Sequence, residues 1–147
     1  MIEFPYRVYV LEDDDYWRAN LREDLARPGR DVTCFESLYQ MIQVLDCGIP
    51  TPDLLVADVA ALSAGCRRFG VSDEAYVSQL RSFLSVRPGV LVGLYSMLGH
   101  DARDIVDLIR ESHPDVAIHH IVFDDMLISH HVKAFVDKYD PATAVKP

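Results

Sequence analysis

The chain has little positive charge. It carries 14 lysines and arginines against 23 aspartates and glutamates, and its formal net charge at pH 7 is −9. Lysine is especially scarce, because Lys133, Lys138 and Lys146 are the only lysines in the sequence. A protein that binds nucleic acid needs a basic face to replace the counterions of the phosphates, and an anionic membrane surface makes the same demand. The composition therefore argues against nucleic acid and membranes as partners.

Long apolar runs and a dense set of cysteines are also missing. No stretch approaches the ~18 apolar residues that a membrane-spanning helix needs, and the opening residues MIEFPY lack the basic flank and apolar run of a signal peptide. The three cysteines, Cys34, Cys47 and Cys66, are odd in number and share no metal-ligand spacing. Reduced thiols are the simplest interpretation, and we expect a cytoplasmic protein.

The sequence does have the size and apolar content of one globular domain. Half of its 147 residues are apolar, so we expect residues 1–147 to form a single domain with a sizeable core. Short apolar runs alternate with amphipathic stretches along the chain. The runs predicted as strands span residues 7–11, 31–35, 53–59, 90–95 and 116–123. The stretches predicted as helices span residues 15–26, 37–45, 73–86, 100–111 and 125–139.

This alternation predicts the fold class. Strands that alternate with helices form a parallel sheet covered on both faces, and the nearly continuous apolar strands agree with burial on both sides. We therefore expect an α/β, doubly wound, flavodoxin-like fold with a five-stranded parallel sheet, the strand order 2-1-3-4-5 and five helices. In such a sheet the winding reverses between the first and third strands, and ligands bind there, beyond the carboxyl ends of the strands.

Acidic side chains stand where two of these strands end. The first strand runs into Glu12 and Asp13, and the third ends in Asp58. The topology brings these three carboxylates to one crevice, where they need either a proton or a hard cation. Mg²⁺ prefers oxygen ligands of this kind, so the residues predict a magnesium site. Ser96, at the end of the fourth strand, would bring a hydroxyl to the same rim.

The stretches RVYVLEDDDYWRANLREDL, DVTCFES and PDLLVADV resemble the receiver domain of two-component response regulators. The resemblance implies that Glu12 and Asp13 bind Mg²⁺ together with Asp58. It also implies that Asp58 accepts a phosphoryl group from a histidine kinase or a phosphotransfer protein, and that Ser96 hydrogen-bonds the phosphoryl oxygens. The function expected from it is that of a signalling receiver that switches a protein-binding face.

The chain departs from the receiver pattern at the end of the fifth predicted strand. Receivers usually carry Lys-Pro there, and the lysine bonds the phosphoryl group. Aligned from HHIVFDDM, this position holds Phe123 and Asp124. His120 then takes the place of an aromatic side chain that rotates on activation.

Two further departures surround the expected phosphoacceptor. Met97 follows Ser96 where a small residue usually stands. The connection after Asp58 lacks the usual proline and is several residues longer, although Arg67 or Arg68 within it could replace the missing lysine. We therefore interpret the chain as an atypical receiver, with a pseudo-receiver that binds partners without phosphorylation as the alternative.

A third interpretation is a haloacid-dehalogenase-like phosphatase. Its nucleophile lies in a D-x-D after the first strand, which Asp13–Asp15 could mimic, and Ser96, Asp124 and Asp125 would fill two later motifs. The expected Thr or Val after the D-x-D is missing, and no lysine precedes Lys133. A receiver, by contrast, is not expected to be an enzyme beyond slow loss of its own phosphoryl group.

The resemblance also suggests where partners bind. In receivers, the downstream protein binds a face that corresponds here to residues 100–111, 116–123 and 125–139. A homodimer through the same face is a second use of it. Asp14 or Asp15 is expected to cap the first helix instead of binding metal, because a carboxylate is favoured at a helix N-terminus.

Overall fold

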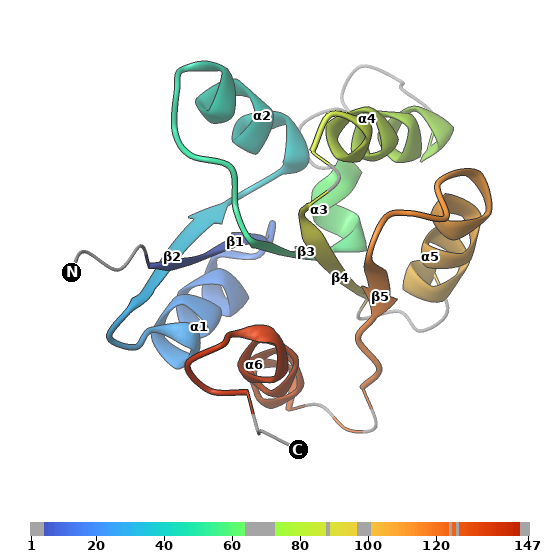
Figure 1. The fold of residues 1–147 in the computed structure, drawn as a ribbon. Helices are drawn as coiled ribbons and strands as arrows, with labels where there is room; N and C mark the ends of the chain where they lie inside the picture. Colours follow the sequence, from blue (N-terminus) through green and yellow to red (C-terminus); the bar gives the residue numbers. More distant parts are fainter. Residues whose placement is uncertain are drawn as a thin grey trace.

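A computed structural model describes residues 5–63, 73–87, 89–96, 101–123, 125 and 127–144. All five strands form one parallel sheet in the order β2-β1-β3-β4-β5, which confirms the predicted fold class and strand order (Figure 1). The strands are β1 (Tyr6–Leu11), β2 (Arg30–Phe35), β3 (Leu54–Asp58), β4 (Leu91–Tyr95) and β5 (Ile118–His120).

Helices cover both faces of this sheet. They are α1 (Asp15–Leu25), α2 (Leu38–Asp46), α3 (Val59–Ser63), α4 (Asp73–Ser85), α5 (Asp101–Ser112) and α6 (Ile128–Tyr139). Helices α1 and α6 lie on one face, while α2, α3, α4 and α5 lie on the other (Figure 1). None of the helices in the described ranges is both long enough and apolar enough to cross a membrane.

Alternation along β1 explains how one strand serves two cores. Val8 and Val10 point into the core beneath α1 and α6. Tyr9 and Leu11 belong to the core on the opposite face. Successive side chains of a strand point to opposite faces, so an apolar run with no polar interruption is what a strand in the middle of a two-sided sheet requires.

Side-chain caps begin α1 and α2, as the sequence predicted. The Asp14 carboxylate accepts a hydrogen bond from the main-chain N–H of Trp17 at 3.0 Å. The Ser37 hydroxyl accepts one from the N–H of Gln40 at 3.1 Å. Each cap satisfies one of the N–H groups that the first turn of a helix leaves without an intrahelical partner.

The largest departure from the predicted elements is around β5. The predicted strand over residues 116–123 is reduced to Ile118–His120, and α6 begins at Ile128 instead of residue 125. β5 is an edge strand that pairs only with β4, and the N–H of Ile121 makes the last bond to that strand, with the Leu94 carbonyl at 2.8 Å. The apolar residues after Ile121 therefore leave the ladder, and the expectation of a longer strand is wrong.

The connection after Asp58 also differs from its prediction. The sequence predicts no helix there, but the first five residues of the connection form α3, so the described part of the chain has six helices instead of five. Ala61 and Leu62 in this helix are buried, which gives the short segment an apolar face to pack on the sheet. Bounds of the other elements agree with the predicted ranges to within one or two residues.

Candidate metal and phosphoacceptor site

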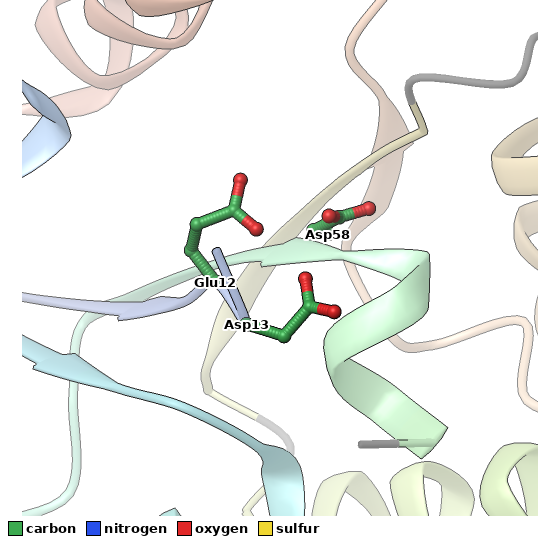
Figure 2. Close-up of side chains that lie close together, drawn as sticks. All are labelled: Glu12, Asp13 and Asp58. Atoms are coloured by element: carbon green, nitrogen blue, oxygen red, sulfur yellow. The ribbon is translucent and has the colours of Figure 1, made fainter. Parts of the chain in front are cut away.

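Three carboxylates converge at the carboxyl edge of the sheet. Asp58 is the last residue of β3, and Glu12 and Asp13 directly follow β1. The two strands are neighbours, and Leu11 pairs with Ala57, so the acidic residues leave the sheet at the same level. Figure 2 shows the three side chains pointing toward one another from these two segments. The predicted convergence is therefore present in the structure.

The spacing of these side chains suits a small divalent cation. One ligand oxygen from each of Glu12, Asp13 and Asp58 can be chosen so that all lie within 4.8 Å of one another. Oxygens bound to one Mg²⁺ at ~2.1 Å lie at most about 4.2 Å apart, so only a small side-chain shift separates this arrangement from coordination. Asp13 is exposed while Glu12 and Asp58 are buried, which leaves one open side for water and a phosphoryl group.

Hydrogen bonds fix the two buried acids. The Tyr95 hydroxyl donates to Glu12 Oε1 at 3.1 Å, and the N–H of Asp14 donates to Glu12 Oε2 at 3.4 Å. The N–H of Ala60 donates to Asp58 Oδ1 at 3.2 Å. Each donor is neutral, so these bonds orient the carboxyl groups without bringing a positive charge to them.

The cluster has no cationic partner within the described ranges, where no lysine or arginine forms an ion pair with any of its three carboxylates. Arg18 lies close to the cluster, but its guanidinium donates to the main-chain carbonyl of Glu12, at 3.0 Å, and not to a carboxylate of the cluster. Burial raises the pKa of Glu12 to about 9, and the charge of Asp58 acts in the same direction.

The pKa of Asp58 is also raised. Burial raises the pKa of Asp58, although contacts with Glu12 and the Ala60 amide oppose that rise. Without a cation the Glu12–Asp58 pair therefore keeps one proton at neutral pH. A metal ion that binds both carboxylates has to displace that proton.

Other predicted residues stand around this cluster. Ser96 comes directly after Tyr95, the residue that pairs with Asp58 across β3 and β4, so Ser96 lies at the same edge of the sheet. Phe123, which the sequence alignment predicts at the position of the receiver lysine, packs its ring against Tyr95 with 5.5 Å between ring centroids. The predictions for Asp124, Met97, Arg67 and Arg68 fall outside the described residues.

The rest of the acidic run does not join the cluster. Asp14 caps α1, and Asp15 pairs with Arg18 within the first turns of that helix. This placement agrees with the expected capping role. It leaves the D-x-D interpretation with only Asp13 in the crevice, since Asp15 lies in the helix.

Tyr95 is the site residue that the sequence analysis missed. It ends the apolar run VLVGLY and therefore reads as a core residue, and its side chain is indeed fully buried. Burial and the negative charge of Glu12 raise the pKa of the Tyr95 phenol well above its ordinary value, so the hydroxyl keeps its proton and stays a donor. The available signal was its place at the carboxyl edge, one residue before Ser96.

Comparison with known proteins identifies the fold but no close relative. The sequence matches no protein-family model and no curated protein. The structure is similar to the phosphorylated cyanobacterial phytochrome response regulator RcpA, with a TM-score of 0.65 and 15% identity over 97% of this chain and 99% of that chain. It is also similar to a response regulator from Thermotoga maritima, with a TM-score of 0.60 and 18% identity over 91% of this chain and 96% of that one.

A protein without a natural function has a similar structure too. A de novo designed Rossmann 2x3 protein matches with a TM-score of 0.57 and 16% identity over 95% of this chain and 93% of that chain. Function must therefore be argued from the site, because the same fold hosts unrelated activities or none. On the evidence of its sheet order and these structural matches, the chain has the flavodoxin-like fold of response-regulator receiver domains.

Proposed function

We propose that the chain is a cytoplasmic signalling receiver that accepts a phosphoryl group on Asp58 with Mg²⁺ as cofactor. The observation that carries the proposal is the convergence of Glu12, Asp13 and Asp58 with ligand oxygens within 4.8 Å of one another. These three residues would hold the ion. When bound, Mg²⁺ supplies positive charge to the phosphoryl oxygens, which is most of what catalysis of phosphoryl transfer requires.

Asp58 is the nucleophile in this proposal. One carboxylate oxygen forms a bond to phosphorus while the bond from phosphorus to the leaving group of the donor breaks, which gives an aspartyl phosphate. The Ala60 N–H, 3.2 Å from Asp58 Oδ1, keeps the carboxylate oriented. Ser96 would donate its hydroxyl to a phosphoryl oxygen, which its place at the end of β4 supports.

The proposed phosphodonor is a histidine kinase or a phosphotransfer protein, and the proposed output is a changed protein-binding face on α5, β5 and α6. Exposed apolar side chains on this side of the fold support the second part. Leu108 of α5 is 45% exposed, and Val122 and Leu127, between β5 and α6, are 65% and 58% exposed. The same face would serve a homodimer, which sedimentation with and without the phosphodonor would detect.

Acetyl phosphate tests the phosphorylation directly. We expect the wild-type protein, incubated with acetyl phosphate and Mg²⁺, to gain the mass of one phosphoryl group, and Asp58→Asn to gain none. Asp53→Asn is the matched control, because Asp53 is exposed and precedes β3 at the opposite end of the same strand. It should gain the phosphoryl group as the wild type does, and chelation of Mg²⁺ should prevent the gain in both.

Other outcomes favour the competing functions. No mass gain by the wild type would replace this proposal with the pseudo-receiver, which is supported by Phe123 standing where a lysine would contact the phosphoryl group. Steady release of phosphate from an ester by the wild type, unchanged in Asp58→Asn, would instead indicate a phosphatase whose nucleophile is Asp13.

A further inference from the structure

Within the described residues, the Tyr95 hydroxyl makes the shortest hydrogen bond to the carboxyl groups of the acidic cluster. Tyr95 is fully buried at the end of β4, and its hydroxyl donates to Oε1 of Glu12, 83 residues away in the sequence, at 3.1 Å. The other oxygen of Glu12 accepts a longer bond from the Asp14 N–H, at 3.4 Å, and the Glu12 side chain also contacts the carboxyl groups of Asp58 and Asp13. Glu12 is 1% exposed, so bulk solvent has little access to its carboxyl group. The Tyr95 phenol is therefore the neutral side-chain donor that orients Glu12 from the core side of the cluster.

Packing fixes where that phenol lies. The ring of Tyr95 contacts Phe123, with 5.5 Å between centroids, and Phe123 in turn contacts His131 at 5.6 Å. Tyr95 also belongs to the buried cluster that includes Ile128 and Val132 of α6. A side chain packed in this way is held close to one rotamer. The position of its hydroxyl is consequently set by the core between the sheet and α6.

We infer that Tyr95 is a positioning residue that holds the Glu12 carboxylate in the geometry for Mg²⁺. The inference rests on the magnesium site proposed above. Mg²⁺ demands nearly ideal octahedral coordination, whereas Ca²⁺ accepts six to eight oxygens in adaptable arrangements. A carboxylate held in one direction by a fixed donor therefore favours Mg²⁺ over Ca²⁺. Tyr95 acts through Glu12 and does not itself contact the ion.

Removing the hydroxyl should therefore weaken Mg²⁺ binding selectively. Loss of a hydrogen bond that orients a metal ligand typically costs about 10–100-fold in affinity. We expect Tyr95→Phe to lose Mg²⁺ affinity in this range, measured by calorimetry, and to lose less Ca²⁺ affinity. The ratio of Mg²⁺ affinity to Ca²⁺ affinity should therefore fall. A general loss of stability would not change this ratio.

Tyr9→Phe is the matched control. Tyr9 is 2% exposed, and its hydroxyl makes a partly buried hydrogen bond, to the Pro50 carbonyl, on the opposite face of the sheet from Tyr95. The substitution removes one tyrosine hydroxyl contact without touching Glu12. Binding of both ions should match the wild type. Equal losses in Tyr9→Phe and Tyr95→Phe would overturn the inference, because they would indicate destabilisation alone.

A double variant separates positioning from direct effects of the substitution. In the Glu12→Gln background, Tyr95→Phe should cause no further change in Mg²⁺ affinity, since the hydroxyl acts only through Glu12. A further loss of the same size as in the wild-type background would overturn the inference. The inference about Tyr95 also fails if Tyr95→Phe binds Mg²⁺ as tightly as the wild type. In that case the proposed receiver function still stands. A wild type that binds no Mg²⁺ removes both proposals together.

Discussion

Glu12 shows how far the site could be read from the sequence one residue at a time. Its place beside Asp13 and Asp58 followed from acidic side chains at the ends of two strands that the fold places side by side, and the structure brings their oxygens within 4.8 Å. Tyr95 could not be found in this way. A tyrosine in an apolar strand indicates burial, and nothing local shows that its hydroxyl reaches a carboxylate 83 residues earlier.

The raised pKa of Glu12 predicts how Mg²⁺ binding depends on pH. With a pKa of about 9, Glu12 is protonated in the ion-free protein at neutral pH, and coordination requires its carboxylate form. The apparent affinity should therefore rise with pH, by about tenfold for each unit below 9, because one proton leaves for each ion bound. Calorimetric titration at pH 7 and pH 8, in buffers of different ionisation enthalpy, measures both the affinity and the proton release.

Glu12→Gln provides the control for this pH dependence. Glutamine has nearly the same shape but no proton to release in this range, so binding should be weaker and nearly independent of pH. Wild-type affinities that agree at pH 7 and pH 8, with no proton released, would contradict the retained proton.

Element bounds were predictable wherever local signals were strong. Asp14 and Ser37 mark helix starts that the structure reproduces, because capping is a contact between residues three positions apart. The end of β5 was not predictable, since it depends on where the backbone hydrogen bonds to β4 end. An apolar run continues through Val122 and Phe123, but Val122 is 65% exposed and Phe123 turns to Tyr95. Hydropathy alone does not distinguish apolar residues in such a loop from apolar residues in a strand.

Gly93 of β4 is required by the close approach of α6. A Cβ at this position would lie 2.5 Å from Cε1 of Phe135 and 2.8 Å from Cδ1 of Ile121. We expect Gly93→Ala to lower the free energy of unfolding by about 1–3 kcal/mol, because overpacking forces the ring or the helix to shift. Urea unfolding followed by circular dichroism measures the change.

Gly89→Ala is the matched control for the packing argument. A Cβ at Gly89 would meet nothing within 4 Å, so the free energy of unfolding should change little. A second variant tests the cause directly: Phe135→Leu should make Gly93→Ala less costly than it is in the wild type, because the shorter side chain leaves room. Equal costs in the two backgrounds would assign the loss to the strand itself.

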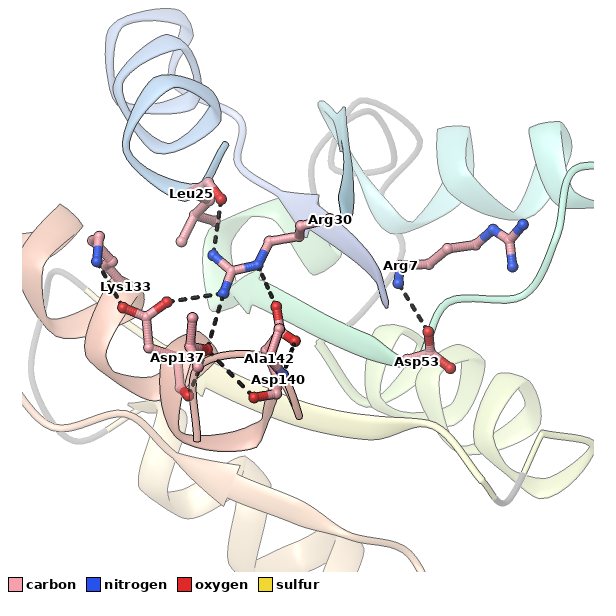
Figure 3. Close-up of polar contacts among 9 residues, drawn as sticks. Arg7, Leu25, Arg30, Asp53, Lys133, Asp137, Asp140 and Ala142 are labelled. Carbon is pink, nitrogen blue, oxygen red and sulfur yellow. Dashed lines mark hydrogen bonds and ion pairs between the residues drawn. The ribbon is translucent and has the colours of Figure 1, made fainter. Parts of the chain in front are cut away.

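The whole molecule is joined by contacts that span nearly its full sequence. The order of the sheet could be predicted because strands and helices alternate regularly and parallel connections follow few topologies. The network around Arg30 could not. Arg30, at the start of β2, donates to Asp140 at 2.8 Å and to Asp137 at 2.9 Å, and also to the Leu25 carbonyl (Figure 3). Its two acidic partners lie 110 and 107 residues away, at the end of α6.

This network should make Arg30 one of the most costly charged residues to remove. The side chains of Arg30 and Asp140 are 1% and 3% exposed, so Arg30→Met leaves a buried carboxylate without its cation. Breaking a buried pair in this way costs about 3–5 kcal/mol of unfolding free energy, measured by urea denaturation. Arg7→Met is the comparison, since Arg7 lies 3.9 Å from Asp31 in a partly exposed pair and should cost at most about 1 kcal/mol.

The double variant Arg30→Met with Asp140→Asn identifies the source of the loss. Asparagine removes the charge of Asp140 but keeps an oxygen that can accept the hydrogen bond from the Ala142 N–H, which closes the turn after α6. If the cost of Arg30→Met is the unpaired buried charge, adding Asp140→Asn should restore part of the stability instead of lowering it further. Losses that simply add would show that the guanidinium stabilises the fold through packing and its bonds to Leu25 and Asp137, and that the ion pair with Asp140 contributes little.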